Sequence, residues 1–406
     1  MDLNITPHRL SGVIQPPPSK SQAHRLMIGA ALANGQSRLG GIALSQDILA
    51  TMRCMRALDA KIREDGSLVQ GVQTIGAAQT NLPQLDCGES GSTLRFLIPI
   101  ALAVAGGGVF TGAGRLMERP LGPYETLFAE KGVELVRENG TLRVEGQLKS
   151  GVYHLAGNVS SQFITGLLYA LPLLQGDSEL MLTTSLESSG YVDMTLDALK
   201  RFGITVEPTL TGWNIPGNQT YRPADCTVES DYSQAAFYYA AALLGNEVTV
   251  KGMNPDSKQG DRAILQQMEQ LKQQGSVTID VRECPDLVPP LAVAAAFRAG
   301  ERTFITGAAR LRIKESDRLH TVTEQLNQLG CQIVEQKDSL EIVGVETVAG
   351  GMVSGCNDHR IAMMLAIAAT RSEETVLLQG AECVEKSYPD FWVDYVTLGG
   401  VIERMG

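Results

Sequence analysis

The sequence is poor in aromatic residues and has fewer basic than acidic side chains. Aromatic residues make up 5% of the 406 positions, and 34 Lys and Arg stand against 45 Asp and Glu, giving a formal net charge of -11. Nucleic acid is bound by surplus cations and by aromatic stacking platforms, so a nucleic-acid partner is not expected. A negative overall charge still permits a local cationic pocket.

The seven cysteines are too scattered for a disulfide framework. Their number is odd and no two form a Cys-x-x-Cys pair, so a thiolate zinc site is not indicated either. We expect reduced and mostly buried thiols.

Long hydrophobic runs are also missing. The longest candidate for a membrane span, 97–110, is short and is broken by three consecutive glycines, and the opening segment MDLNITPHRL lacks a basic stretch followed by an apolar one. We therefore expect a cytoplasmic protein with no membrane partner.

The remaining composition is that of an ordinary globular protein. Hydrophobic residues make up 44% and charged residues 19% of the chain. At roughly 150 residues per domain, the length predicts two or three domains with real cores.

A helical apolar period that ends in glycine and is followed by a β-rich segment recurs along the chain. This self-similarity predicts six copies of a small α/β unit, too long for solenoid repeats. The copies are 46–71, 118–146, 190–217, 260–281, 314–344 and 388–403. Glycines fitting left-handed helix ends are Gly132, Gly203, Gly275, Gly330 and Gly399.

Alanine-rich apolar stretches lie between these copies, at 163–174, 235–244, 291–297 and 361–369. A helix that is apolar on nearly every face must be buried inside a domain. Six units, each with one amphipathic and one buried helix, suggest two domains of three units with helical cores and outer sheets. The predicted fold class is α/β or α+β.

Small polar and basic residues gather at the predicted starts of three helices. In PPPSKSQAHR (16–25), stiff prolines precede Lys20, Ser21 and Arg25, and free N–H groups at a helix start favour anions. The alternative is a plain solvated helix start.

Two further segments have the same design. The segment CGESGSTLRFL (87–97) offers Gly91 for close backbone approach to a ligand, without the Lys of a Walker loop. The segment GNVSSQFITGLL (157–168) offers three donors beside a helix start: Ser160, Ser161 and Gln162. Ordinary capping turns remain the alternative for both.

Five basic residues lie in short polar motifs beside the repeat helices: Arg119, Lys314, Arg318, Arg360 and Lys386. Singly, each is compatible with a solvated salt bridge. Together they indicate that an acidic protein binds small molecules carrying several negative charges.

Three residues are candidates for proton transfer. Asp286 directly precedes a buried apolar helix and could accept a proton from a substrate hydroxyl, although a helix N-cap is an equal alternative. Glu315 and His359 are further acid or base candidates, each flanked by cations.

The motifs together resemble a known family. They are SKSQAHR, LDCGESGSTLRFL, MERP, NVSSQF, PDLVPPLAV, RLRIKESDRL, NDHRIAM and KSYPDF, in this order over nearly the whole chain. This series closely resembles the 3-phosphoshikimate 1-carboxyvinyltransferase (EPSP synthase) family.

The resemblance implies a two-domain inside-out α/β barrel. Each domain would have three βαβαββ-like repeats with buried helices and outer sheets. One domain would contain 1–18 and 229–406 and the other 19–228, with the active site in a cleft between them that closes on the ligands. A monomer is expected.

The implied reaction joins the enolpyruvyl group of phosphoenolpyruvate to the 5-hydroxyl of shikimate 3-phosphate and releases phosphate. Both substrates are multiply anionic, which suits a site rich in Lys and Arg. No metal or organic cofactor is implied.

The motifs also carry over expected contacts. Those to shikimate 3-phosphate are Lys20, Ser21, Arg25, Ser160, Ser161, Gln162, Ser188, Asp286 and Lys314. Those to phosphoenolpyruvate are Lys20, Gly91, Arg119, Gln162, Arg318, Arg360 and Lys386. As catalytic residues, Asp286 would accept the hydroxyl proton, Glu315 would protonate the methylene carbon, and Lys20 would assist proton transfer.

Two positions depart from the commonest pattern of the family. Glu89 stands in a loop that often reads GNAGTAMR, and it adds a negative charge near the expected phosphoenolpyruvate site. Arg310 stands where an asparagine often contacts shikimate. Both changes bear on affinity and inhibitor response more than on reaction type.

Two alternatives stay open. The related UDP-N-acetylglucosamine enolpyruvyl transferases need a loop cysteine and a Lys-Asn pair, whereas 115–120 lacks cysteine and Lys20 is followed by Ser21. A non-catalytic homologue that only binds an anionic metabolite is the second. The presence of Asp286 and Glu315 argues against it.

Overall fold

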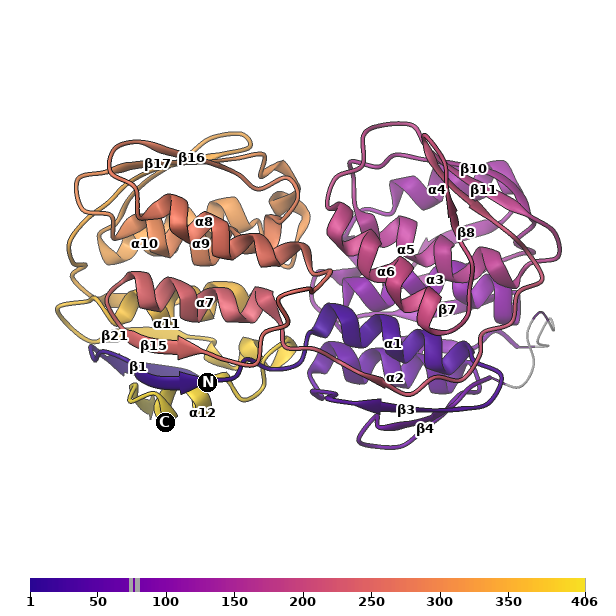
Figure 1. Cartoon of the computed structure of the whole chain (residues 1–406), viewed down its shortest axis with the longest axis horizontal. Helices are drawn as coiled ribbons and strands as arrows, with labels where there is room; N and C mark the ends of the chain where they lie inside the picture. The colour runs from indigo at the N-terminus through magenta and orange to yellow at the C-terminus, as the bar shows by residue number, and fades with distance from the viewer. Residues whose placement is uncertain (73–75, 77–80, 406) are drawn as a thin grey trace. The chain divides into compact units, whose positions relative to one another are not determined.

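The computed structural model describes residues 1–72, 76 and 81–405 of the chain, which divides into two compact units (Figure 1). Unit 1 contains Met1–Ser19 and the chain from Ser230 onward, and unit 2 contains Lys20–Glu229. Each unit has its own hydrophobic core.

Unit 2 is built from three copies of one βα arrangement. The first copy contains β14 (Cys226–Thr227), α1 (Lys20–Leu32), β3 (Gln36–Gly40), α2 (Gln46–Ala57), β4 (Lys61–Ile62) and β5 (Leu68–Gln70). The second contains β6 (Gln84–Asp86), α3 (Gly91–Ala105), β7 (Gly107–Thr111), α4 (Gly122–Lys131), β8 (Glu134–Glu138) and β9 (Thr141–Glu145). The third contains β10 (Gly151–Leu155), α5 (Ser161–Ala170), β11 (Ser178–Leu182), α6 (Ser189–Arg201), β12 (Glu207–Pro208) and β13 (Gly212–Ile215).

Unit 1 repeats the arrangement three times. The first copy contains β2 (Ser11–Ile14), α7 (Tyr232–Leu243), β15 (Glu247–Val250) and α8 (Ile264–Leu271). The second contains β16 (Val277–Asp280), α9 (Val288–Ala296), β17 (Arg302–Thr306), α10 (Arg318–Leu329), β18 (Gln332–Glu335) and β19 (Leu340–Val343). The third contains β20 (Gly351–Ser354), α11 (His359–Ala369), β21 (Val376–Gln379), α12 (Phe391–Thr397), β22 (Val401–Met405) and β1 (Asp2–Thr6).

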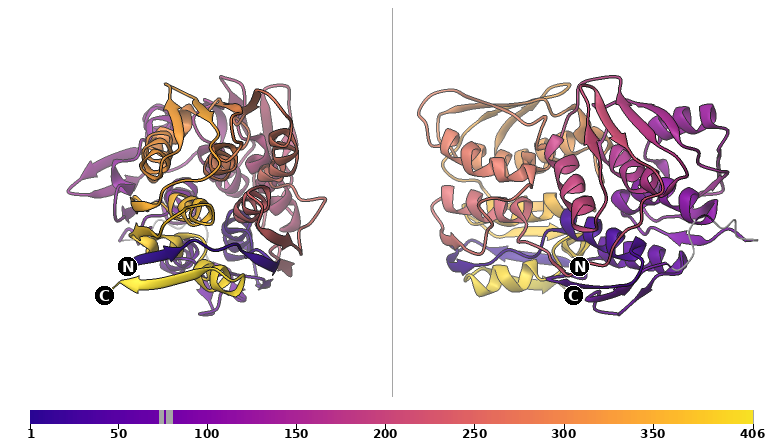
Figure 2. Two further views of the ribbon diagram at one scale, coloured as in Figure 1. Left: turned by 90° about the vertical axis from the view of Figure 1, so that its left-hand side faces the viewer. Right: turned by 45° about the vertical axis from the view of Figure 1, so that its right-hand side comes forward.

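The sheets share one topology. Among the described residues, five sheets have four strands, of which the first two are parallel and the others are added antiparallel; the sixth is the parallel pair β15–β2. The third copy of unit 1 completes its sheet with both ends of the chain. There Asp2 lies opposite Met405, and β1 and β22 run side by side in Figure 2.

One helix of each copy is buried inside its unit: α1, α3, α5, α7, α9 and α11. In α9, VPPLAVAAA, all nine residues are buried, as expected of a helix without a polar face. Figure 1 shows α7, α8, α9, α10 and α11 of unit 1 between the β16–β17 layer and the β1–β15–β21 layer. The predicted α/β class with helical cores and outer sheets is therefore confirmed.

The helix boundaries differ in detail from the sequence patterns. The buried helix predicted at 163–174 ends at Ala170 and continues as a 3-10 turn through Leu173, because Pro172 lacks the N–H that a longer α-helix needs. Gly132 and Gly330 are confirmed as stop glycines, since they cap α4 and α10 in the left-handed conformation with φ of 70° and 107°. Gly203 and Gly399 directly follow the C-caps of α6 and α12, whereas Gly275 lies three residues beyond Lys272, the C-cap of α8.

The repeat places the starts of the buried helices at the same end of each unit. Arg95 on α3 hydrogen-bonds Gln162 on α5, and in unit 1 Arg360 on α11 bonds Asp286 just before α9. Polar residues at the starts of different helices of one unit are therefore in contact with each other.

The structure also bears on the expectations about the cysteines and about membrane-spanning segments. The seven cysteines are free, and six of them are buried. Among the described helices, none is long and apolar enough to cross a bilayer.

Candidate active site

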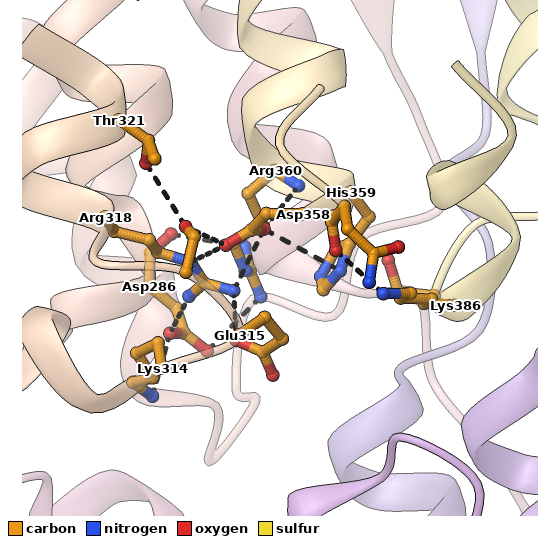
Figure 3. Close-up of polar contacts among 12 residues, drawn as sticks. Asp286, Lys314, Glu315, Arg318, Thr321, Asp358, His359, Arg360 and Lys386 are labelled. Atoms are coloured by element: carbon orange, nitrogen blue, oxygen red, sulfur yellow. Dashed lines mark hydrogen bonds and ion pairs between the residues drawn. The ribbon is translucent and has the colours of Figure 1, made fainter. Parts of the chain in front are cut away.

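Arg318, at the start of α10, is the centre of a buried ion network in unit 1 (Figure 3). Its Nη1 lies 2.9 Å from Asp286 Oδ1, and its Nη2 lies 2.7 Å from Glu315 Oε2. Its Nε donates to Asp358 Oδ2 at 2.7 Å. Because the side chain is 2% exposed, the alternative of a solvated surface pair is wrong for Arg318.

Asp286 forms ion pairs with two further basic side chains. Lys314 Nζ lies 3.1 Å from its Oδ1, and Arg360 Nη2 lies 3.3 Å from its Oδ2. Burial alone would raise the pKa of the Asp286 carboxyl, but Lys314, Arg360 and Arg318 together hold that pKa well below its ordinary value. The carboxylate is therefore ionised at neutral pH.

Asp286 does not cap the helix that follows it. It lies in a 3-10 turn, Pro285–Leu287, and the N-cap position of α9 is Leu287. The N-cap alternative for Asp286 is therefore wrong, and its carboxylate serves the ion network instead.

Asp358 is a member of this network that the sequence analysis missed. Its fully buried side chain caps α11 by accepting from the Arg360 backbone N–H at 3.0 Å, and it also accepts from Ser316 Oγ. An Asp three residues before the apolar stretch 361–369 was the available signal, but it indicates only a cap.

The other predicted cation of unit 1 lies near the same helix. Lys386 is buried and donates to the Asn357 carbonyl at 2.7 Å, while the buried His359 ring lies beside Asp358, with Nδ1 3.9 Å from Oδ1. Figure 3 shows all three side chains around the start of α11.

In unit 2, the start of α1 presents two cations. Lys20 Nζ forms an ion pair with Asp47 Oδ2 on α2 at 2.8 Å, a partner that the sequence analysis did not identify. Arg25 is buried, with Nη1 bonding the Ser21 carbonyl at 2.6 Å and Nε bonding Thr195. Burial lowers the pKa of Arg25 to about 10, so it stays charged at neutral pH.

Gln162, at the start of α5, is held by two residues of α3. Its Oε1 accepts from Arg95 Nη1 at 2.7 Å and its Nε2 donates to Ser92 Oγ at 2.9 Å. Arg95, on α3, is a buried cation that sequence reasoning missed because its motif had been interpreted as a glycine turn. Ser160 caps α5 by accepting from the Gln162 backbone N–H, and the buried Ser161 begins the helix.

Gly91 is the first residue of α3, and it lies against Arg119. A Cβ added at Gly91 would be 2.5 Å from Arg119 Nη1, so the guanidinium packs directly on this glycine. In the same unit, buried Ser188 has a left-handed φ of 59° just before α6, which is uncommon for a residue other than glycine.

The two departures from the family pattern have distinct surroundings. Glu89 extends toward the neighbouring loop, where a Cβ added at Gly114 would be 2.7 Å from its Oε2. Arg310 donates to the Arg282 carbonyl.

The starts of the buried helices differ electrostatically between the units. The first turns of α1, α3 and α5 contain no acidic residue. Lys20 begins α1, and Arg25 and Arg95 lie in the second turns of α1 and α3. Free N–H groups and the helix dipole add to this preference for anions. In unit 1, by contrast, Asp286 and Asp358 stand at the helix starts and are paired with cations.

No group of three or more His, Cys, Asp and Glu side chains in 1–72, 76 and 81–405 is arranged to hold a metal ion. The arrangement offers donors for phosphate and carboxylate groups, and two carboxylates, Asp286 and Glu315, held by one arginine. Such a fold and site define an enzyme that acts on small anionic metabolites.

The chain belongs to the EPSP synthase (3-phosphoshikimate 1-carboxyvinyltransferase) family, whose model matches residues 5–394. It is 44% identical to the 3-phosphoshikimate 1-carboxyvinyltransferase of Clostridium perfringens, with 98% of each chain covered. It is 45% identical to that of Clostridium acetobutylicum, over 99% of this chain and 98% of the relative. It is thus an enolpyruvyl transferase.

Solved structures agree with this assignment. The EPSP synthase of Acinetobacter baumannii aligns with a TM-score of 0.80 and 25% identity over 99% of both chains. The enolpyruvyl transferase NikO of Streptomyces tendae has the same fold, with a TM-score of 0.77 and 16% identity over 100% of this chain and 98% of that one.

Proposed function

We propose that this enzyme joins the enolpyruvyl group of phosphoenolpyruvate to the 5-hydroxyl of shikimate 3-phosphate with the residues predicted from its motifs. The observation that carries the proposal is the network in which Arg318 holds two candidate proton-transfer groups, Asp286 and Glu315. A base and a second carboxyl group held by one rigid guanidinium can serve proton transfers at neighbouring atoms, the second group once it has taken up a proton.

Both units contribute to substrate binding in this proposal. Shikimate 3-phosphate is held by two residues of unit 1, Asp286 and Lys314. In unit 2 it is held by residues at the helix starts: Lys20, Ser21, Arg25, Ser160, Ser161, Gln162 and Ser188. Phosphoenolpyruvate is held by Lys20, Gly91, Arg119, Gln162, Arg318, Arg360 and Lys386. The cations neutralise the phosphate and carboxylate charges.

The reaction then proceeds by addition and elimination. Asp286 accepts the proton of the 5-hydroxyl, whose oxygen attacks C2 of phosphoenolpyruvate, while Glu315 gives a proton to C3. The product of this step is a tetrahedral intermediate. In the second step C3 returns a proton to Glu315, and the electrons of that C–H bond form the C2–C3 double bond. The bond from C2 to the phosphate oxygen breaks, and phosphate leaves with that electron pair and with the proton that Asp286 had accepted.

The ion network also sets the strength of the base. With three cations around it, Asp286 is a weak base, because each cation stabilises the ionised form. Substrate anions that accept hydrogen bonds from Lys314 and Arg360 draw these cations away from Asp286. Binding of the substrates thus raises the proton affinity of Asp286 when it is needed.

Product formation tests the proposal directly. The purified enzyme is mixed with both substrates in metal-free buffer, and phosphate release and the enolpyruvyl product are followed by a colorimetric assay and mass spectrometry. Stoichiometric release of phosphate supports the proposal. Binding without turnover would support the non-catalytic homologue, and product with UDP-N-acetylglucosamine instead would support the related transferase.

Replacing Asp286 by asparagine tests its role as the base. We expect Asp286→Asn to bind shikimate 3-phosphate within a few-fold of the natural enzyme, while turnover falls by about two to four orders of magnitude. Asp280→Asn is the matched control, because Asp280 forms a more exposed pair with Arg282. Near-normal turnover of Asp286→Asn would remove it from this role.

We also propose that the enzyme is a cytoplasmic monomer. Its free thiols support a reducing compartment, and each unit's separate core supports a chain that folds without a partner. Light scattering measures the oligomeric state.

A further inference from the structure

A chain of buried hydrogen bonds connects three helices of unit 2 and is not used by the mechanism above. His24 Nδ1 on α1 lies 2.7 Å from Thr51 Oγ1 on α2, which lies 2.7 Å from Thr93 Oγ1 on α3. Thr93 Oγ1 in turn donates to Ser90 Oγ, the N-cap of α3, at 2.7 Å. We call these four residues the His24 chain; all four are essentially inaccessible to solvent.

The His24 chain lies one helical turn from the Lys20–Asp47 ion pair. Lys20 and His24 are four residues apart on α1, and Asp47 and Thr51 are four residues apart on α2, so each pair shares one helix face. The ion pair and the imidazole–hydroxyl bond are therefore two successive cross-links between the same helices. Thr93 extends the second cross-link to α3.

The direction of the hydrogen bonds can be assigned from the number of available protons. The one hydroxyl proton of Thr93 has Ser90 Oγ as its nearer acceptor and the Asp47 carbonyl, at 3.5 Å, as its more distant one. With either acceptor Thr93 accepts from Thr51, and Thr51 accepts from His24 Nδ1–H. The opposite direction would leave a proton on His24 Nε2, which is buried without a hydrogen-bond partner among the described residues. A buried N–H without an acceptor costs more than the same site without a proton.

The surroundings keep His24 neutral. Burial lowers its pKa well below the ordinary value, and the positive charges of Lys20 and Arg25 lower it further. The ring also packs edge-on against Phe96 of α3, with centroids 6.3 Å apart. A neutral imidazole with a fixed tautomer acts as a rigid directional link and not as a proton carrier.

We propose that the His24 chain is a positioning device which holds Lys20 of α1 in register with the start of α3 and thereby sets the affinity for phosphoenolpyruvate. The inference rests on the proposed function, in which Lys20 and Gly91 both contact that substrate. Gly91 directly follows the Ser90 end of the chain, and Lys20 lies one turn from its His24 end. None of the chain's side chains needs to touch substrate for this role.

Valine substitutions test the chain because valine has the shape of threonine without the hydroxyl. We expect Thr51→Val and Thr93→Val each to raise KM for phosphoenolpyruvate by about five- to twentyfold, the scale of one or two lost hydrogen bonds. KM for shikimate 3-phosphate and kcat should change less than about twofold. Thr93→Ser keeps the hydroxyl and should restore KM to within about twofold of the natural enzyme.

Thr303→Val provides the matched control for a merely structural role. Thr303 is equally buried, lies in unit 1, and accepts a hydrogen bond from Arg298 Nη1 at 2.6 Å. We expect this variant to unfold at lower urea concentration with both KM values unchanged. If Thr51→Val and Thr93→Val behave in the same way as this control, the proposed role is wrong.

A spectroscopic measurement keeps the inference testable even if the valine variants fail to fold. In the intact enzyme labelled with 15N, the His24 ring, assigned by its loss in His24→Gln, should show a proton on Nδ1 and constant shifts from pH 8 to pH 5.5. A ring that titrates in this range, or that carries its proton on Nε2, would overturn the assignment. Absence of product from the natural enzyme would instead contradict the proposed function and leave this spectrum as an independent result.

Discussion

At the scale of single residues, the cations of the candidate site are already paired within the protein. Arg318 is fixed by three carboxylates, and Lys20 is held by Asp47. Fixed cations lose little side-chain entropy on binding an anion, and charge-assisted bonds restrict their geometry. In the proposed site these donors are therefore fixed in position, unlike flexible side chains on the protein surface.

The low pKa of Asp286 predicts how stability depends on pH. Since its folded-state pKa lies below the unfolded value of about 4, its contribution to the free energy of unfolding is complete above that value and is lost as pH falls toward the lowered pKa. We expect the natural enzyme to lose stability from about pH 5 to pH 2 more steeply than Asp286→Asn. Urea unfolding at several pH values measures this difference, and parallel curves would contradict the lowered pKa.

The contact between Gly91 and Arg119 predicts a selective binding defect. In Gly91→Ala the new methyl group would lie 2.5 Å from Arg119 Nη1, so the guanidinium must move. We expect KM for phosphoenolpyruvate to rise by at least about tenfold, with KM for shikimate 3-phosphate nearly unchanged. Steady-state kinetics with each substrate varied in turn decide the matter; equal changes in both would show a general distortion.

The sequence indicated the basic residues of the candidate site, but not their carboxylate partners. Helix-start motifs indicated Lys20, Arg318 and Arg360, because these residues stand beside local patterns of small residues and glycine. Their carboxylate partners could not be inferred, since Asp47 is 27 residues from Lys20 and Asp358 is 40 residues from Arg318. Such pairs form when helices that are distant in sequence pack against each other. Local sequence patterns do not specify this packing.

At the scale of elements, a glycine at the end of an amphipathic helix reverses the chain into the following hairpin. Gly132 ends α4 with φ of 70° and Gly330 ends α10 with φ of 107°. This left-handed conformation costs a residue with a Cβ about 1 kcal/mol or more. The repeat was visible in the sequence because the same backbone requirement recurs in each copy.

A substitution at one helix end tests this requirement. A Cβ added at Gly132 would meet no atom within 4 Å, so the cost of Gly132→Ala is conformational alone. We expect the free energy of unfolding to fall by about 1 kcal/mol with unchanged kinetics. Gly122→Ala, at the start of the same helix and equally free of contacts, should leave stability unchanged or slightly higher. Equal effects of the two substitutions would contradict the argument.

Helix boundaries were the less predictable part of the elements. The apolar pattern of α5 continues to Leu174 in the sequence, but the helix stops at Ala170, near Pro172. In α3, by contrast, Pro99 lies inside a continuous helix. Tertiary packing decides which proline is tolerated, and hydrophobic periodicity does not contain that information.

At the scale of the whole molecule, the two cores are separate. The core of unit 2 contains only residues between Ala23 and Val228, and that of unit 1 contains only residues before Ser19 or after Ser230. The sheets are equally separate, since each of the described sheets takes its strands from one unit. Each unit therefore has the internal contacts that an independent domain requires.

This separation predicts that unit 2 folds alone. A fragment of residues 20–229 should show cooperative urea unfolding and dispersed NMR signals. A fragment of 20–217 is the control: it lacks β14, which pairs with β3, and also Tyr221, which is fully buried, so it should be less stable. A disordered 20–229 fragment would show that the units depend on one another.

The pairing of β1 with β22 suggests that the chain can be circularly permuted. Asp2 and Met405 are neighbours across one ladder of backbone hydrogen bonds, although nearly the whole chain separates them. A short linker could therefore join the two termini, and the protein could begin instead at an exposed turn such as Asn139–Gly140 between β8 and β9. In such a permuted chain β22, the linker and β1 would follow one another, so the strands of this ladder would be neighbours in sequence as well as in space.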